Sequence, residues 1–161
     1  MIKKIILTFF VLLALSVNSY SAGSSDNSKN KTSYDKAVVH IKSAKKYEKK
    51  DKIKKANKRY EKALKLLIKS NKEKPNSPDT LNYLGFTTRK LGDYKNGEKF
   101  YLEGLAIEPN HIGINEYLGE LYVVTNRISL AKERLKVLES CNCKEYNQLR
   151  EVIQGIKKSK Y

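Results

Sequence analysis

The sequence predicts an all-α protein, a superhelix of antiparallel helix pairs with a C-terminal capping helix. Apolar residues recur at spacings of three and four along most of the chain after residue 32, which is typical of helices that bury one face. A step of 34 residues carries residues 83–85 (Tyr-Leu-Gly) onto residues 117–119 (Tyr-Leu-Gly). A fixed period of this length indicates stacked repeats. Gly92 and Pro109 follow two of the apolar stripes, at positions where helices commonly end.

Residues 1–21 are predicted to form a signal peptide. Two lysines give a basic start, residues 5–17 are almost all apolar, and small polar residues follow. The apolar run of 13 residues is shorter than the ~20 that a membrane-spanning helix needs. We expect cleavage after Ser21, with Ser19 and Ala22 as alternative positions, and a periplasmic location in a Gram-negative bacterium.

The next two segments differ in whether they contain a periodic pattern of apolar residues. Residues 22–32 are rich in Ser, Asn, Gly and Lys, so they cannot bury enough apolar surface to offset the entropy of ordering, and we expect a disordered leader. Residues 33–76 predict a basic, degenerate helix pair, with a break near Asp51 where the apolar stripe shifts phase. Thr32 and Asp35 suit a capping box at the start of the first helix.

Most of the positive charge lies in this basic pair. Residues 31–74 contain 17 Lys or Arg and five Asp or Glu, a net charge of +12. Three interpretations stay open: a solvated polar face, a surface for an acidic protein or anionic lipid, and a nucleic-acid surface. The last is disfavoured because Lys outnumbers Arg 28 to 5, whereas bidentate phosphate recognition favours Arg. Export from the cytoplasm also argues against nucleic acid, which we do not expect as a partner.

Residues 77–140 are predicted to form two complete helix pairs. The Ser-Pro-Asp run at 77–79 supplies a cap, a first-turn proline and an acid at the positive end of a helix. Gly92 suits the left-handed stop of that helix, and Asp93 can cap the next one. Asn110 is expected to cap the third pair.

Several glycines fall inside the predicted helices, where each costs roughly 1 kcal/mol relative to Ala. We expect Gly85 and Gly119 to lie where the first helix of each pair meets the second, with Gly97 and Ala131 facing them. A small residue at such a crossing lets two backbones approach closely.

The residues of the first complete pair form a recognisable series: Leu84, Gly85, Gly92, Tyr94, Gly97, Tyr101 and Pro109. This series resembles the tetratricopeptide repeat (TPR), and the order of segments resembles small exported bacterial TPR proteins. The next unit repeats the series in part, with Leu118, Gly119, Tyr122, Ala131 and Leu135. Departures from the pattern are Leu81 and Asn115 where Trp is frequent, Thr88 for Tyr and Gly104 for Ala.

The resemblance implies a concave face lined by the first helix of each pair, where such proteins bind an extended peptide or a helix of a partner. The positions that match this face are Asn82, Phe86, Arg89, Lys90, Glu116, Glu120 and Val123. The alternative is that these are ordinary solvent-facing helix positions.

Residues 141–161 are predicted to form a Cys turn and a C-terminal capping helix, which runs from Glu145 to about Lys157. Three states of Cys141 and Cys143 stay open: an intramolecular disulfide, reduced or intermolecularly paired thiols, and a metal site. We expect no metal site, no cofactor and no catalytic residue, since the two histidines lie far apart and no catalytic motif is present.

The sequence therefore predicts a non-enzymatic, exported TPR scaffold or adaptor that binds one or more envelope proteins or peptides through its concave groove. An alternative function is a basic module that tethers the protein to an anionic membrane or envelope polymer. A third is an accessory subunit of an envelope enzyme or thiol-redox system that uses the Cys turn. The oligomeric state does not follow from the sequence.

Overall fold

The computed structural model describes residues 31–159, and the predicted signal peptide and most of the predicted leader lie outside them. This part of the chain forms seven α-helices and one short 3-10 helix and has no strand, which confirms the all-α prediction. The elements are α1 (Ser33–Glu48), α2 (Ile53–Glu73), α3 (Pro78–Lys90), α4 (Tyr94–Ile107), α5 (Ile112–Val124), α6 (Ile128–Val137), η2 (Glu139–Cys141) and α7 (Lys144–Ile153).

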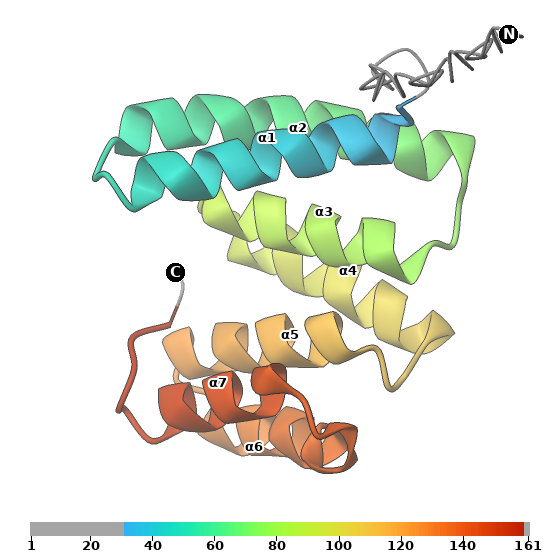
Figure 1. The fold of residues 1–161 in the computed structure, drawn as a ribbon. Coiled ribbons are helices and arrows are strands. Elements are labelled where there is room, and N and C mark those ends of the chain that lie inside the picture. Colours follow the sequence, from blue (N-terminus) through green and yellow to red (C-terminus); the bar gives the residue numbers. More distant parts are fainter. Residues whose placement is uncertain (1–30, 160–161) are drawn as a thin grey trace, which may run out of the picture.

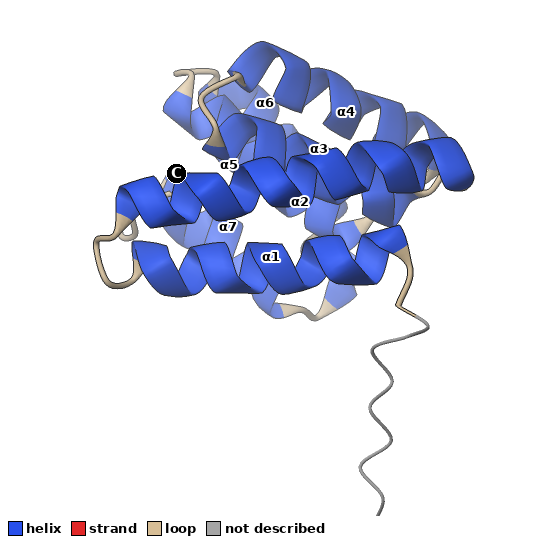
Figure 2. Ribbon diagram, turned by 90° about the horizontal axis from the view of Figure 1, so that it is seen from above, coloured by secondary structure: helices blue, strands red, loops and turns tan. Residues whose placement is uncertain are grey.

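Successive helices pack as three antiparallel pairs, and the pairs stack on one another in chain order (Figure 1). Helices α1 and α2 form the first pair, α3 and α4 the second, and α5 and α6 the third. Helix α7 packs mainly against α5 and also touches α6, so it covers the open end of the stack as the capping helix was predicted to do (Figures 1 and 2). No helix within residues 31–159 is both long and apolar enough to cross a membrane.

The helix starts follow the local capping chemistry. The Thr32 side chain accepts a hydrogen bond from the Asp35 N–H, and the Asp35 carboxylate accepts one from the Thr32 N–H, which completes the predicted capping box. Asp93 caps α4. The prediction of Asn110 as the cap of α5 is wrong, because His111 occupies that position and its Nδ1 accepts from the Ile114 N–H at 3.1 Å.

The turns between helices also follow the sequence. The break predicted near Asp51 lies between α1 and α2, and Asp51 has a positive φ of 53°. Gly92 ends α3 with a φ of 95°, in the left-handed region that favours glycine. Asn126 has a φ of 58° in the turn between α5 and α6, a conformation that Asn adopts more readily than most residues.

Helix α7 is shorter than predicted. It ends at Ile153 instead of about Lys157. Gly155 has a φ of 71°, and the N–H groups of Gly155 and Ile156 donate to the carbonyls of Val152 and Glu151. This is the hydrogen-bond pattern of a Schellman stop, which turns the chain away from the helix axis.

Two helical glycines mark close helix crossings. A Cβ added at Gly85 would lie 2.5 Å from the Tyr101 ring of α4, as expected for the contact within the α3–α4 pair. At Gly119 the nearest atoms belong to another element, because an added Cβ would lie 2.5 Å from Leu149 of α7. Gly119 therefore makes room for the capping helix.

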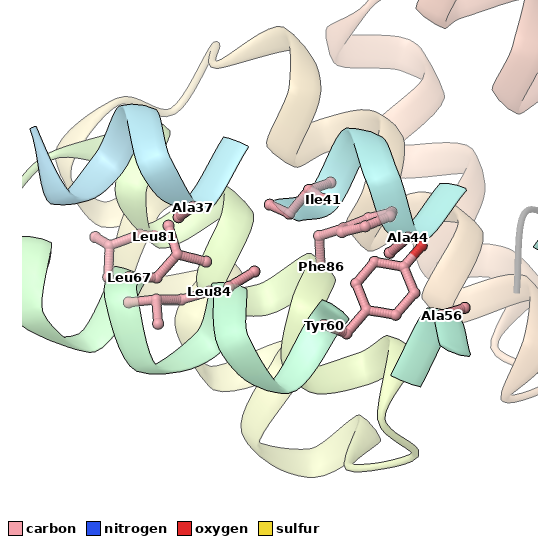
Figure 3. Close-up of a cluster of buried hydrophobic side chains, with 10 residues drawn as sticks. Ala37, Ile41, Ala44, Ala56, Tyr60, Leu67, Leu81, Leu84 and Phe86 are labelled. Carbon is pink, nitrogen blue, oxygen red and sulfur yellow. The ribbon is translucent and has the colours of Figure 1, made fainter. Parts of the chain in front are cut away.

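The core joins the first two pairs without a break. Phe86 of α3 projects toward α1 and α2 and lies near Ile41, Ala44 and Tyr60 (Figure 3). A second cluster fills the space between α4, α5 and α6, around Tyr101 and Leu118. The basic first pair is thus packed onto the repeats and is part of the same stack.

Candidate binding face

The face formed by α1, α3 and α5 carries the residues that the resemblance assigned to a groove. Two of these residues, Lys90 and Val123, are half-buried. The other five are almost fully buried, with exposed fractions of 7% or less: Asn82, Phe86, Arg89, Glu116 and Glu120. The structure thus places most of the predicted set beneath the surface of the face.

Two of these five buried residues, Arg89 and Glu120, form an ion pair. Nη2 of Arg89 lies 3.8 Å from Oε2 of Glu120, and both side chains have an exposed fraction of 0%. Nη1 of the same guanidinium donates to the backbone carbonyl of Tyr117. Burial of two charges is tolerated only when each is compensated, so this pair connects α3 to α5 and is not available as an open contact.

The segment after α7 covers part of this face. Ser159 Oγ donates to Oε2 of Glu120 at 3.1 Å. Lys157 lines the same depression as Phe86 and pairs with Glu151 at 3.7 Å. The stop at Gly155 therefore directs residues 156–159 back toward Glu120 of α5.

Phe86 anchors a cluster of rings and a lysine. Its ring centroid lies 5.9 Å from that of Tyr60 and 5.1 Å from that of Tyr117. Nζ of Lys45 lies 4.4 Å from the Phe86 ring centroid, within the range of a cation–π contact. Lys45 also donates to the Tyr117 hydroxyl at 3.4 Å. Burial raises the pKa of Tyr117 above its usual value.

Glu48 and Lys90 connect α1 to α3 beside this cluster. Nζ of Lys90 lies 2.5 Å from Glu48 Oε1, and the Tyr60 hydroxyl donates to Glu48 Oε2 at 2.9 Å. Burial first, and then the bond to Glu48, raises the pKa of Tyr60. Both oxygens of this carboxylate are thus engaged within the protein.

Two depressions remain open between α1 and α3, and we call them together the α1–α3 groove. The first has a volume of about 460 Å³ and is lined by Lys31, Tyr34, Asp35, Val38, Val39, Lys42 and Tyr83. The second has a volume of about 480 Å³ and is lined by Lys45, Glu48, Lys49, Phe86 and Lys157. Of the predicted groove residues, only Phe86 lines either depression, and it forms the floor of the second.

The α1 side of this groove was missed at the sequence level. The resemblance covered only the second helix of the first pair, so no residue of α1 was assigned to the face. A signal was present, because Val38, Lys42, Lys45 and Lys49 follow one another at spacings of four, three and four. That spacing puts them on one side of a helix.

The two cysteines form an intramolecular disulfide, the first of the three states considered. Their α-carbons lie 5.1 Å apart, within the range that a disulfide requires. Asn142 between them has a positive φ of 46°, which makes the tight turn. Across residues 31–159 no group of three or more His, Cys, Asp or Glu is arranged to hold a metal ion.

Comparison with known proteins supports the fold. No protein-family model matches the sequence, and no curated protein matches it. Among solved structures, the chain resembles the first TPR domain of Spaghetti (RPAP3) bound to an HSP90 peptide, with 21% identity, a TM-score of 0.54, and coverage of 78% of this chain and 96% of that one. The first TPR domain of human RPAP3 gives 21% identity, a TM-score of 0.55, and coverage of 78% and 98%.

A bacterial structure is similar to the same degree. The type III secretion translocator chaperone SycD of Yersinia enterocolitica shares 14% identity with a TM-score of 0.55, over 80% of this chain and 88% of that one. At these identities the likeness is one of fold. It confirms that this chain has the tetratricopeptide repeat fold, a helix-pair repeat.

Proposed function

We propose that the protein is a non-catalytic scaffold or adaptor that binds another protein on the side of α1, α3 and α5. The observation that carries this proposal is the α1–α3 groove, an open, partly apolar feature on the concave side of an otherwise packed repeat stack. Two structures of the same fold support it by what they do, since one is bound to an HSP90 peptide and the other is a secretion chaperone.

We further propose that the protein works in the periplasm on envelope proteins or peptides. The support is the basic start, apolar run and small polar residues of positions 1–21. Cell fractionation followed by N-terminal sequencing tests it. We expect a mature chain in the periplasmic fraction that begins at Ala22. An uncleaved chain in the cytoplasmic fraction would contradict export.

Site-specific photocrosslinking in intact cells tests the binding face. Val39 lies in the first depression with an exposed fraction of 53%, and Leu102 lies on α4 with a similar exposed fraction of 48%. A photoreactive benzoylphenylalanine at position 39 should give a discrete adduct with a partner protein, which mass spectrometry identifies. The same group at position 102 is the matched control. Equal adducts at the two positions, or none at position 39, would contradict the proposal.

A second candidate function is the attachment of the basic first pair to an anionic membrane or envelope polymer. The observation that favours it is the exposed surface of α2, which is rich in lysine: Lys54, Lys55, Lys58, Lys62, Lys65, Lys69 and Lys72. Such a surface predicts binding to phosphatidylglycerol vesicles that falls steeply with salt, because exposed charges are screened. Absent or salt-insensitive binding would reject it.

A further inference from the structure

The α1–α3 groove has a charged edge along α1. Lys42, Lys45 and Lys49 share one side of that helix, since they are three and four residues apart. Lys42 lines the first depression, and Lys45 and Lys49 line the second. The two depressions are therefore connected by one row of lysines, which we call the α1 lysine row.

The carboxylates that line the groove are already bonded within the protein. Asp35 accepts hydrogen bonds from the backbone and side chain of Thr32, and Glu48 is held by Lys90 and the Tyr60 hydroxyl. By contrast, Lys42 and Lys49 are exposed, and neither has a carboxylate within ion-pair distance in the described part of the chain. The open groove consequently carries an excess of positive charge.

The rest of the groove lining is aromatic or apolar, and it comes from both α1 and α3. The rings of Tyr34 and Tyr83 lie 5.8 Å apart in the first depression. Val39 has an exposed fraction of 53% at the same place, and Phe86 forms the floor of the second depression. An occupant thus meets both ammonium groups and apolar surface along the groove.

We propose that the α1–α3 groove binds an acidic segment of a partner protein, in which carboxylates face the α1 lysine row and apolar side chains enter the two depressions. The inference rests on the proposed function, since it names the class of partner for that same face. Further along the face, Glu120 is buried and paired with Arg89, and Ser159 of the segment after α7 covers it. Binding is therefore confined to α1, α3 and the segment after α7.

A membrane is a poorer fit to the same charges. The lysine row lines two depressions that also contain apolar side chains, and a protein segment can fill them whereas a flat bilayer surface cannot. The lysines exposed on α2 lie on the opposite helix of the pair and are better placed for a flat anionic surface. This difference separates the two partners experimentally.

Fluorescence anisotropy with defined peptides tests the proposal on the full mature chain. The probe is a short fluorescein-labelled peptide that alternates Glu with Phe and Leu, and the control peptide carries Gln at every Glu position. The groove variant is Lys42→Glu with Lys49→Glu. The matched control is Lys58→Glu with Lys65→Glu, which changes the net charge equally on exposed positions of α2.

We expect the Glu peptide to bind, the Gln peptide to bind at least about tenfold more weakly, and the groove variant to lose about tenfold in affinity for the Glu peptide. The α2 control should change affinity by less than about twofold. Equal losses in the two double variants would overturn the proposal in favour of a diffuse basic field. Equal binding of the Glu and Gln peptides would overturn it as well.

Two further results separate this inference from the proposed function. If phosphatidylglycerol vesicles bind and the groove variant alone abolishes that binding, the lysine row serves an anionic lipid and the acidic-peptide proposal fails. If position 39 gives a crosslinked partner while the Glu peptide does not bind, the partner has another chemistry and the scaffold function stands. If neither is observed, both proposals fail.

Discussion

The two ends of the face formed by α1, α3 and α5 differ in accessibility, although Phe86 at one end and Glu120 at the other occupy equivalent repeat positions. Between α1 and α3 the face is open, lined by lysines, and floored by Phe86. At α5 the corresponding positions are closed, because Glu120 pairs with Arg89 inside the protein and the chain after α7 covers it.

The difference teaches that a repeat position does not decide by itself whether its side chain meets solvent. Whether a later segment of the chain packs over that position decides the exposure of the side chain. Helix α7 and the residues after Gly155 return to the third pair, while nothing in residues 31–159 covers α1 in the same way. In a short repeat stack, the length of the binding face consequently depends on how much of it the capping helix and the residues after that helix cover.

The largest expected effect comes from opening the closed end of the face. In a Glu120→Leu variant, the Arg89 guanidinium remains buried without its carboxylate, and we expect a loss of about 3–5 kcal/mol in the free energy of unfolding. A double variant with Arg89→Met should recover more than half of that loss, because no unpaired charge remains. Urea unfolding measures both.

The exposed pair of Lys69 and Glu73 provides the control for this experiment. These side chains lie 3.6 Å apart with exposed fractions of 66% and 50%. A Glu73→Leu change should therefore alter stability by less than about 1 kcal/mol. Equal losses for Glu73→Leu and Glu120→Leu would show that burial of the Arg89–Glu120 pair does not set its importance.

The next effect compares the two close helix crossings. Gly85→Ala places a Cβ 2.5 Å from the rigid ring of Tyr101, which is fully buried. We expect it to lower the free energy of unfolding by about 2 kcal/mol, even after the gain in helix propensity. Gly119→Ala meets the branched end of Leu149, which can rotate away, so about 1 kcal/mol or less is expected. Thermal or urea unfolding measures both losses. A larger loss for Gly119→Ala would show that the crossing at Leu149 is the less tolerant of the two.

Much of the fold could be predicted because its determinants are local. The capping box at Thr32 and the left-handed turns at Gly92 and Asn126 depend on residues within one helix turn of each boundary, and the 34-residue period is visible along the sequence itself. His111 shows the limit of this reasoning. Asn110 is the more common cap, but the chain bends one residue later and the imidazole accepts the bond instead.

The state of the face could not be predicted in the same way because it depends on contacts between distant segments. The periodicity put Arg89 and Glu120 on the correct side of their helices, yet it gave no sign that they approach each other. The return of residues 156–159 follows from Gly155, a single residue in a stripe that otherwise continues through Ile156. With the helix stopped, Ile156 has an exposed fraction of 74%.

A smaller effect is expected from removing the cover. A chain that ends at Gly155 loses the hydrogen bond from Ser159 to Glu120, and a single bond of this kind to a charged group contributes about 1.5–3 kcal/mol at most. Since Ser159 lies outside any helix, in the segment after α7, we expect about 1 kcal/mol and a decrease in Tm of a few degrees. An Ile156→Ser change, at an exposed position of the same segment, should leave Tm unchanged. An unchanged Tm in the truncated chain would show that the segment adds no stability to the closed end.

The smallest effect concerns the open end, where the charge of the first pair acts on His40 of α1. Burial, and then the positive charges of Arg59 and Lys62 on α2, lower the pKa of His40 below its usual 6.5. The unfolded chain therefore takes up a proton as the pH falls through about 6.5, while the folded chain resists it, so stability is present above that pH and is lost below it. Comparison of urea midpoints at about pH 7.5 and pH 5.5 should show a smaller decrease for His40→Gln than for the parent chain. An equal decrease in both would mean that burial and the charges of Arg59 and Lys62 do not hold the pKa of His40 below its usual value in the folded chain.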